Sequence, residues 1–241
     1  MTVTLTVKAA SRTHQGLVRR RNEDSYSQGQ WLYVVADGLG GHVAGDIASS
    51  TVTGILEAYD RPVQAKDLAS FIGRAINEAG EALRRKIRED PKLAGMGTTL
   101  VALLRSGGEA VVANVGDSRA YLIRRHGFRD DTMLQVSEDH TYEHLVADAG
   151  KVPNLGEKLT RFLDGRNDGR SPDLTPLQLC PGDRVLLCSD GLSSYVPHDQ
   201  IQAALASDKS PGEVADQLID LAVDQGGHDN VTVIVLDVTQ R

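Results

Sequence analysis

The sequence predicts an α+β sandwich, because runs of strands are separated from pairs of helices along the chain. Two short turns, RSGGE at 105–109 and RRHGF at 124–128, separate apolar runs and favour antiparallel hairpins over crossover helices. With 241 residues, of which 40% are hydrophobic, the chain can bury one sizeable core. We therefore expect a single domain over residues 1–241.

Apolar runs rich in β-branched residues predict the strands. The runs are short, and most are bounded by residues that favour turns. The predicted strands are residues 2–7, 31–36, 98–104, 110–115, 119–123, 184–188 and 231–238.

Helical periodicity is strongest in residues 43–59, 66–89 and 211–224. The last of these starts with Pro211 and is followed by glycine, which is the asymmetry typical of helices. Residues 148–173 are only weakly periodic and are rich in Gly, Asn, Asp and Pro. We expect a surface excursion there, of a kind that often carries function.

Composition excludes several classes of protein. The net charge of -7 argues against a nucleic-acid partner, since the basic run at 19–21 is too short to reverse it. Neither a signal peptide nor an apolar run of about 20 residues is present, so we expect a cytoplasmic protein with no membrane partner, and a monomer. Cys180 and Cys188 form no CxxC pair and are predicted to be buried free thiols.

Four aspartates each stand at the end of a predicted strand: Asp37, Asp117, Asp190 and Asp229. Their Gly, Ser or Asn neighbours allow tight turns and close approach of a ligand. Carboxylates that converge in apolar surroundings repel each other unless a multivalent cation lies between them. All-oxygen ligands favour Mg²⁺ or Mn²⁺. One such aspartate alone would as readily be a turn or capping residue, so the repetition carries the prediction.

Six motifs then identify a family by their order along the chain. They are RRRNED (19–24), ADGLGGH (36–42), GTTL (97–100), VGDSRAYL (115–122), CSDGL (188–192) and HDNVTV (228–233). With them the sequence resembles the metal-dependent Ser/Thr protein phosphatases of the PP2C family over about residues 11–235, and it looks like a short bacterial member. The resemblance implies a four-layer α-β-β-α sandwich, in which two antiparallel sheets lie between helix pairs and the metals lie in a cleft at one edge.

The resemblance also implies metal ligands. Asp37 resembles the carboxylate that bridges two core metals, and Gly38 the residue whose carbonyl ligates one of them. Asp190 and Asp229 look like the remaining ligands of the second metal. Asp117 resembles the ligand of a third, weaker metal, shared with Asp190.

Further roles follow from the same resemblance. Glu23 and Asp24 match an acidic pair that binds the metals directly or through water. Arg19 falls where the family holds the substrate phosphate, a role suited to a planar guanidinium that donates two hydrogen bonds. One position departs from many eukaryotic relatives, because Leu39 replaces a histidine that is a candidate general acid. His42 and a metal-bound water remain alternative proton donors.

The activity implied is hydrolysis of phosphoserine and phosphothreonine in proteins. Two Mn²⁺ or Mg²⁺ ions about 3.5 to 4 Å apart, with a third as an option, would lower the pKa of a bridging water so that hydroxide attacks phosphorus. Asp37 and Arg19 are the catalytic candidates, since the metals and Arg19 neutralise phosphoryl charge. The expected partners are proteins phosphorylated by a cognate Ser/Thr kinase in signal transduction, selected in part by the excursion at 148–173.

Two other functions stay open, and one metal site is disfavoured. GDSRA approximates a serine-hydrolase nucleophile elbow with Ser118 at its tip and His228 downstream, although a strand and not a helix is predicted to follow. A catalytically inert family member that acts as a binding module is the second alternative. His140 and His144 are four residues apart, but Thr141 replaces the glutamate of HExxH, so they predict a solvated helix face and no zinc site.

Overall fold

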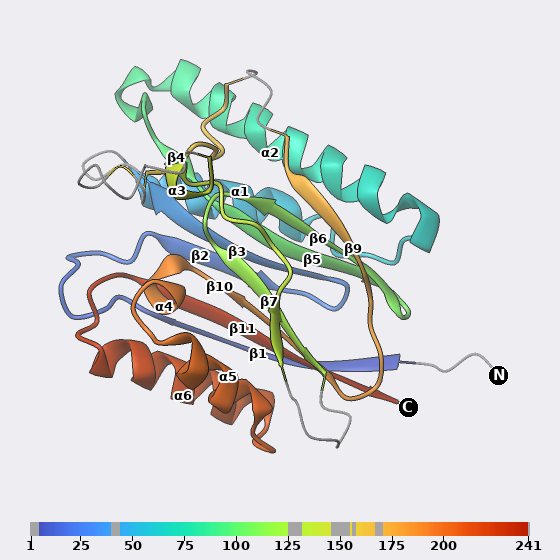
Figure 1. Cartoon of the computed structure of the whole chain (residues 1–241). Helices are drawn as coiled ribbons and strands as arrows, with labels where there is room; N and C mark the ends of the chain where they lie inside the picture. Colours follow the sequence, from blue (N-terminus) through green and yellow to red (C-terminus); the bar gives the residue numbers. More distant parts are fainter. Residues whose placement is uncertain are drawn as a thin grey trace.

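The computed structural model describes residues 5–39, 44–124, 132–145 (without the side chains of 144 and 145), 155, 158–166 and 171–240. Four layers are stacked in it, with helices outside and two sheets inside (Figure 1). The predicted α-β-β-α sandwich is therefore confirmed. One outer layer holds the long helices α1 (Gly45–Glu57) and α2 (Leu68–Glu89). The other holds α4 (Asp190–Ser193), α5 (His198–Ala206) and α6 (Pro211–Asp224).

The sheet under α1 and α2 has the order β2-β3-β5-β6-β9, with β4 paired to β3, and all its pairs are antiparallel. Its strands are β2 (Asp24–Gln28), β3 (Leu32–Leu39), β4 (Gly97–Thr98), β5 (Leu100–Ser106), β6 (Glu109–Val115) and β9 (Asp173–Gln178). Short 3-10 turns, η1 (Ala65–Asp67) and η2 (Pro91–Leu93), flank α2.

The second sheet has the order β1-β11-β10-β7-β8 and is also antiparallel. Its strands are β1 (Leu5–His14), β11 (Val231–Gln240), β10 (Asp183–Cys188), β7 (Arg119–Arg124) and β8 (Met133–Gln135), and a short helix, α3 (Tyr142–Leu145), follows β8. Alternate side chains of both sheets interdigitate between them, among them Val35, Val101, Leu187 and Ile234. Separate apolar clusters join each sheet to its helices.

Each predicted strand overlaps a strand of the structure, but three strands were not predicted. Residues 2–4 of the first predicted strand lie outside the described residues, and β1 continues to His14. The run predicted at 98–104 is divided between β4 and β5. β2 is the polar segment DSYSQ, and β9 contains Pro176, so neither has the apolar pattern of a buried strand. β9 lies at a sheet edge, where proline is tolerated. The third, β8, has only three residues. Of the predicted excursion at 148–173, half of the residues lie outside those described, and its last residue begins β9.

A buried ion pair ties the second sheet to α5. The side chain of Arg184 on β10 is fully buried and donates to Asp237 on β11 at 2.6 and 2.8 Å. It also donates to the carbonyls of Leu205, Ser207 and Lys209 at 2.9, 2.9 and 2.7 Å. Each guanidinium N–H thus has an acceptor, which is the condition under which a buried charge is tolerated.

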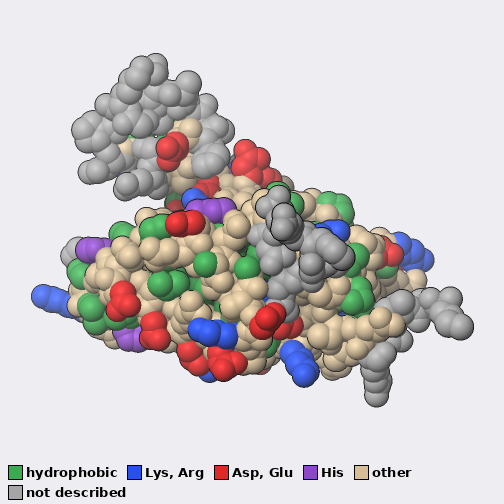
Figure 2. All heavy atoms as spheres, turned by 60° about the horizontal axis from the view of Figure 1, so that its bottom comes forward, with side chains coloured by type: hydrophobic (Ala, Val, Ile, Leu, Met, Phe, Trp, Pro, Cys, Tyr) green, Lys and Arg blue, Asp and Glu red, His purple; other side chains and the backbone are tan. Residues whose placement is uncertain are grey.

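Surface features agree with the composition. On the face shown in Figure 2, Lys and Arg side chains stand apart from one another and Asp and Glu lie between them, so this face has mixed charge. Across the described ranges, no helix is long and apolar enough to span a bilayer.

Candidate metal centre

The predicted carboxylates meet where β2 begins and β3 ends. Asp24, the first residue of β2, is the direct cross-strand partner of Asp37 on β3. Like charges directly opposite each other in a sheet are destabilising. This register therefore indicates that something other than the two side chains stabilises the pair.

The backbone of Asp37 is fixed by the GTTL motif. Its N–H donates to the Thr99 hydroxyl at 3.0 Å, and its carbonyl accepts from the Thr98 hydroxyl and the Thr99 N–H, both at 2.8 Å. The Thr99 hydroxyl in turn contacts that of Ser118 at 2.6 Å. These bonds tie the end of β3 to the turn that carries Asp117.

Ser118 has the environment of a structural residue. Its side chain is fully buried, and β7 begins at the next residue, Arg119. A nucleophile elbow requires an exposed serine followed by a helix. The serine-hydrolase alternative is therefore not supported.

Gly38 allows β3, α1 and Glu23 to approach closely. A Cβ at Gly38 would lie 2.3 Å from the carbonyl oxygen of Gly45 and 2.6 Å from that of Glu23, so no side chain fits. The Gly38 carbonyl oxygen and one carboxylate oxygen of Glu23 each lie 2.9 Å from the point where a Gly45 Cβ would be. Two of the predicted ligands thus converge on one place.

Asp190 begins α4 and follows Ser189, which connects it to Asp24. The Ser189 hydroxyl donates to Asp24 Oδ2 at 2.8 Å and accepts from the Thr232 N–H at 2.9 Å. The other carboxylate oxygen of Asp24, and Oδ1 of Asp190, are buried and have no hydrogen-bond partner within the described part of the chain. Buried polar atoms are almost always paired, so these two oxygens indicate a missing ligand.

The acid groups repel each other electrostatically. Burial raises the pKa of Asp24 and of Asp117 to about 7, and the charge of Asp190 adds to both shifts. Burial also raises the pKa of Asp37 well above its usual value, followed by the charges of Asp24 and Asp190. The pKa of Asp190 is raised by burial and by Asp229. The predicted carboxylates therefore share one low-dielectric region.

Arg19 lies at the mouth of this region. Its guanidinium donates to Asp229 at 2.6 Å, while its side chain is 52% exposed and that of Asp229 only 17%. The hydrogen bond to Asp229, together with the charges of Asp190 and Asp37, raises the pKa of Arg19 against the opposing effect of burial. One face of the arginine therefore contacts the cluster, and the rest reaches solvent.

The residues present fit a divalent cation. Among the side chains that the structure describes, no three of His, Cys, Asp and Glu already lie in a geometry that would hold a metal ion. The unpaired oxygens of Asp24 and Asp190 would gain partners from an ion, and its charge would offset the repulsion. The donors are all oxygens, which hard ions such as Mg²⁺ and Mn²⁺ prefer.

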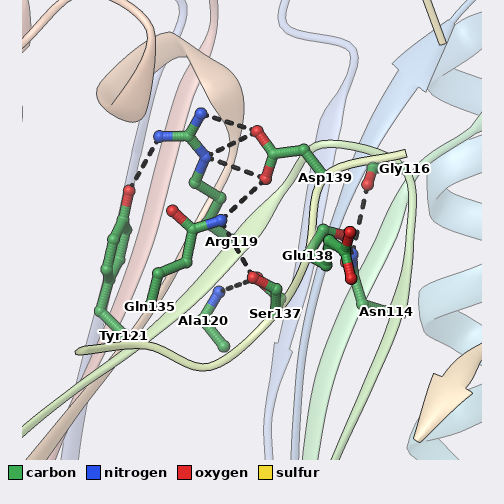
Figure 3. Close-up of polar contacts among 9 residues, drawn as sticks. All are labelled: Asn114, Gly116, Arg119, Ala120, Tyr121, Gln135, Ser137, Glu138 and Asp139. Carbon is green, nitrogen blue, oxygen red and sulfur yellow. Dashed lines mark hydrogen bonds and ion pairs between the residues drawn. The ribbon is translucent and has the colours of Figure 1, made fainter. Parts of the chain in front are cut away.

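The sequence did not reveal a buried network beside Asp117 (Figure 3). Arg119 donates to Asp139 through Nε at 2.9 and 3.0 Å and through Nη2 at 2.7 Å, and its Nη1 donates to the Tyr121 hydroxyl at 3.0 Å. Gln135 donates to Asp139 at 3.0 Å. The network anchors the strand that follows the Asp117 turn to the segment after β8. In the sequence, the only feature that could have pointed to this network is the acidic pair Glu138 and Asp139, directly before His140.

The prediction for His140 was wrong. His140 is only 4% exposed and lies before α3, so it is not on a solvated helix face. Its backbone N–H donates to the Gly116 carbonyl, and its Nδ1 accepts from the Gly116 N–H, both at 3.0 Å. Its Nε2 lies 3.0 Å from Asp173, which also accepts from Arg161 at 2.7 Å. These bonds hold His140 against the Asp117 turn, which a solvated helix would not allow.

Asn230, the third residue of HDNVTV, holds the loop that carries Arg19. Its side-chain N–H groups donate to the carbonyls of Gln15 and Arg21, each at 2.8 Å. Its side-chain oxygen accepts from the Glu23 N–H at 2.8 Å. One buried amide thus connects the loop before β2 to the start of β11.

A four-layer sandwich with an oxygen-lined acidic centre and an arginine at its mouth defines the class of metal-dependent phosphatases. The chain belongs to the protein phosphatase 2C family, whose profile, described as Protein phosphatase 2C, matches residues 10–221.

Named relatives and solved structures support the same family. The chain is 39% identical to Serine/threonine protein phosphatase PstP of Mycobacterium tuberculosis, over 98% of this chain and 46% of PstP, so it spans about half the length of that relative. It is 34% identical to Serine/threonine phosphatase stp of Listeria monocytogenes, over 97% of each chain. The PstP catalytic domain, solved in complex with two manganese ions, superposes with a TM-score of 0.88 at 39% identity, over 98% of this chain and 100% of that one. PppA of Pseudomonas aeruginosa gives 0.83 at 31% identity, over 98% and 99%.

Proposed function

We propose that this protein hydrolyses phosphoserine and phosphothreonine in proteins and that it uses two Mn²⁺ or Mg²⁺ ions. The observation that carries the proposal is a pair of buried oxygens, on Asp24 and Asp190, that have no hydrogen-bond partner among the described residues and lie in a carboxylate cluster beside Arg19. The phosphatase names of the relatives and the two manganese ions in the PstP structure support it.

Seven residues would hold the ions in this proposal. Each offers an oxygen at the cluster, and they are Glu23, Asp24, Asp37, Gly38 through its carbonyl, Asp190, Asp229 and, for a third ion, Asp117. When bound, the ions supply a water acidic enough to attack phosphorus at neutral pH, so no protein nucleophile is required.

Arg19 would bind and orient the phosphate. Its raised pKa keeps it cationic, and its half-exposed guanidinium lies next to the cluster through its bond to Asp229. A guanidinium donates two parallel hydrogen bonds to phosphate oxygens and offsets charge that develops there. Leu39 offers no proton to the leaving oxygen, and His42 lies outside the described residues.

The proposal also covers the domain organisation, oligomeric state, location and partners of the protein. We expect residues 1–241 to act as one phosphatase domain, as a monomer in the cytoplasm, on proteins phosphorylated by a cognate Ser/Thr kinase. The mixed surface charge, with a net charge of -7, supports protein partners over nucleic acid.

The test is phosphate release from a phosphothreonine peptide by purified protein, with Mn²⁺, with EDTA, and with a serine-directed covalent inhibitor. We expect release that needs the metal and that the inhibitor leaves unchanged. Metal-independent hydrolysis that the inhibitor blocks would instead favour the Ser118 alternative. Manganese binding without any hydrolysis would favour the inert binding module.

A further inference from the structure

Two apolar side chains directly precede Arg19 and project into solvent. Leu17 is 66% exposed and Val18 63%, the two highest values among the exposed large hydrophobic residues of the described chain. Single exposed apolar residues are common on protein surfaces and need no explanation. Two adjacent ones beside a candidate phosphate-binding residue form a surface that we call the apolar shelf.

The loop that carries the shelf is held in place on both sides. The N–H groups of Leu17 and Val18 donate to the carbonyl of Gly227 at 2.7 and 3.3 Å. The Gln15 side chain donates to the carbonyl of Arg19 at 2.7 Å. With the two bonds from Asn230, these contacts leave no free stretch between β1 and Arg19. The exposure therefore belongs to an ordered surface, which loses little entropy when a ligand binds.

The shelf continues into the segment that leads to Asp229. A Cβ on Gly227 would lie 2.8 Å from Leu17 Cγ, so the leucine packs directly on the glycine backbone. The next residue, His228, packs its ring against that of Tyr195, with centroids 5.2 Å apart, and Tyr195 is 38% exposed. Figure 1 places the loop after β1 at the same end of the sandwich as the segment that joins α6 to β11. Apolar surface thus flanks the Arg19–Asp229 pair.

We propose that the apolar shelf, Leu17 and Val18, binds an apolar side chain of the substrate protein within two residues of the phosphorylated Ser or Thr. The proposal rests on the proposed phosphatase function and adds a substrate class to it. Residues of an extended peptide are at most about 3.6 Å apart, so two positions from the phosphorylated residue span about 7 Å. When Arg19 holds the phosphate, a neighbouring side chain at that range meets the residues next to Arg19.

The experiment compares two phosphothreonine peptides of equal charge. One carries leucine at the two positions on each side of the phosphothreonine, and the other carries serine there. We expect the wild-type protein with Mn²⁺ to prefer the leucine peptide about tenfold in kcat/KM, mainly through KM, because an open apolar contact discriminates modestly. The double variant Leu17→Ser/Val18→Ser should bring the two peptides close to parity.

A matched control separates the shelf from general surface effects. Leu134 on β8 is 59% exposed, so Leu134→Ser removes a similar exposed side chain that lies on another element. We expect it to keep the wild-type preference, and thermal unfolding should show that all variants fold. Fluorescence anisotropy with non-hydrolysable phosphonate versions of both peptides should give the same order of binding.

Three outcomes would overturn the proposal that the apolar shelf binds substrate. The wild type could use and bind the two peptides equally, or Leu134→Ser could lose the preference as much as the double variant does. In the third outcome, the double variant changes the oligomeric state of the protein but keeps the wild-type preference. The last would identify the shelf as a contact between copies of the chain. Failure of the proposed function looks different, because neither peptide nor p-nitrophenyl phosphate would then release phosphate. Phosphonate binding would still report on the shelf.

Discussion

Asp24 and Asp37 lie directly opposite each other across the β2–β3 pair. Burial raises the pKa of both carboxyl groups, and neighbouring charges add to it: Asp190 and Asp229 for Asp24, and Asp24 and Asp190 for Asp37. The folded chain without metal therefore holds both groups at a cost. In the proposed metal centre a bound cation would recover this cost, because the ion would be attracted by every carboxylate that repels the others. We therefore expect metal binding and stability to be coupled.

Manganese should stabilise the protein against heat. At a concentration a hundred times the dissociation constant, a ligand contributes about 2.7 kcal/mol. For a chain of this size that corresponds to a rise in Tm of roughly 5 to 10 °C. Differential scanning fluorimetry with Mn²⁺, and then with excess EDTA, would measure it. An unchanged Tm at millimolar Mn²⁺ would contradict the metal centre.

Removing one carboxylate charge should separate activity from stability. We expect Asp37→Asn and Asp190→Asn each to lower metal-dependent phosphatase activity by roughly a hundredfold or more. The metal-free Tm of each variant should rise, because a repelling charge is lost. Asp220→Asn, on the exposed face of α6, is the control and should change neither property. Full activity in either cluster variant would exclude that residue as a ligand.

The metal-free protein should lose stability as pH rises. The pKa of Asp24 and of Asp117 is about 7 in the folded state, well above the ordinary 3.8. Between these values the folded state binds more protons than the unfolded state, so the free energy of unfolding falls as pH increases. Urea titrations in EDTA from pH 4 to pH 7 would show the decline, whereas a stability that climbs over this interval would contradict the shifts.

Asn230→Ala should weaken phosphate binding through the Arg19 loop. The change leaves two carbonyls and one N–H without their partner, which costs about 1 to 3 kcal/mol of stability. We expect KM for a phosphopeptide to rise several-fold more than kcat falls. Asn230→Asp keeps the acceptor for Glu23 but not the two donors, so it should not restore KM. If Asn230→Ala also abolished the rise in Tm that Mn²⁺ causes, the substitution would have disturbed the neighbouring residue Asp229, a proposed metal ligand, and not only the Arg19 loop.

Two Arg–Asp pairs should differ in their effect on stability because they differ in burial. The side chain of Asp139 is 4% exposed and that of its partner Arg119 is 25% exposed, and Asp139→Ala should cost about 3 kcal/mol, because a mostly buried guanidinium loses its anion. Asp216 is 57% exposed beside Arg12, and Asp216→Ala should cost at most about 1 kcal/mol. Urea unfolding of both variants would measure the difference, and equal costs would show that burial does not decide it.

Candidate site residues could be predicted where a pattern of neighbouring residues in the sequence marks them. Asp37 and Asp190 each follow an apolar strand, and the pattern of strand, acid and glycine is visible within a few residues. β2 was missed because its polar side chains gain their order from pairing with β3, not from their own pattern. Asn230 could not be given a role because its carbonyl partners are 215 and 209 residues away. His140 was misassigned because its partners belong to the Gly116 turn.

The pairing of β1 with β11, and the dependence of buried Arg184 on Asp237, bear on how the chain is made in the cell. Among the strands that the structure describes, β1 is synthesised first and its sheet neighbour β11 last. Until Asp237 emerges, the guanidinium of Arg184 lacks its anion, and Asp229 cannot join Asp37. A nascent chain therefore gains the second sheet and the acidic cluster at nearly the same point of synthesis, and a chain that stops before Asp229 has neither in full.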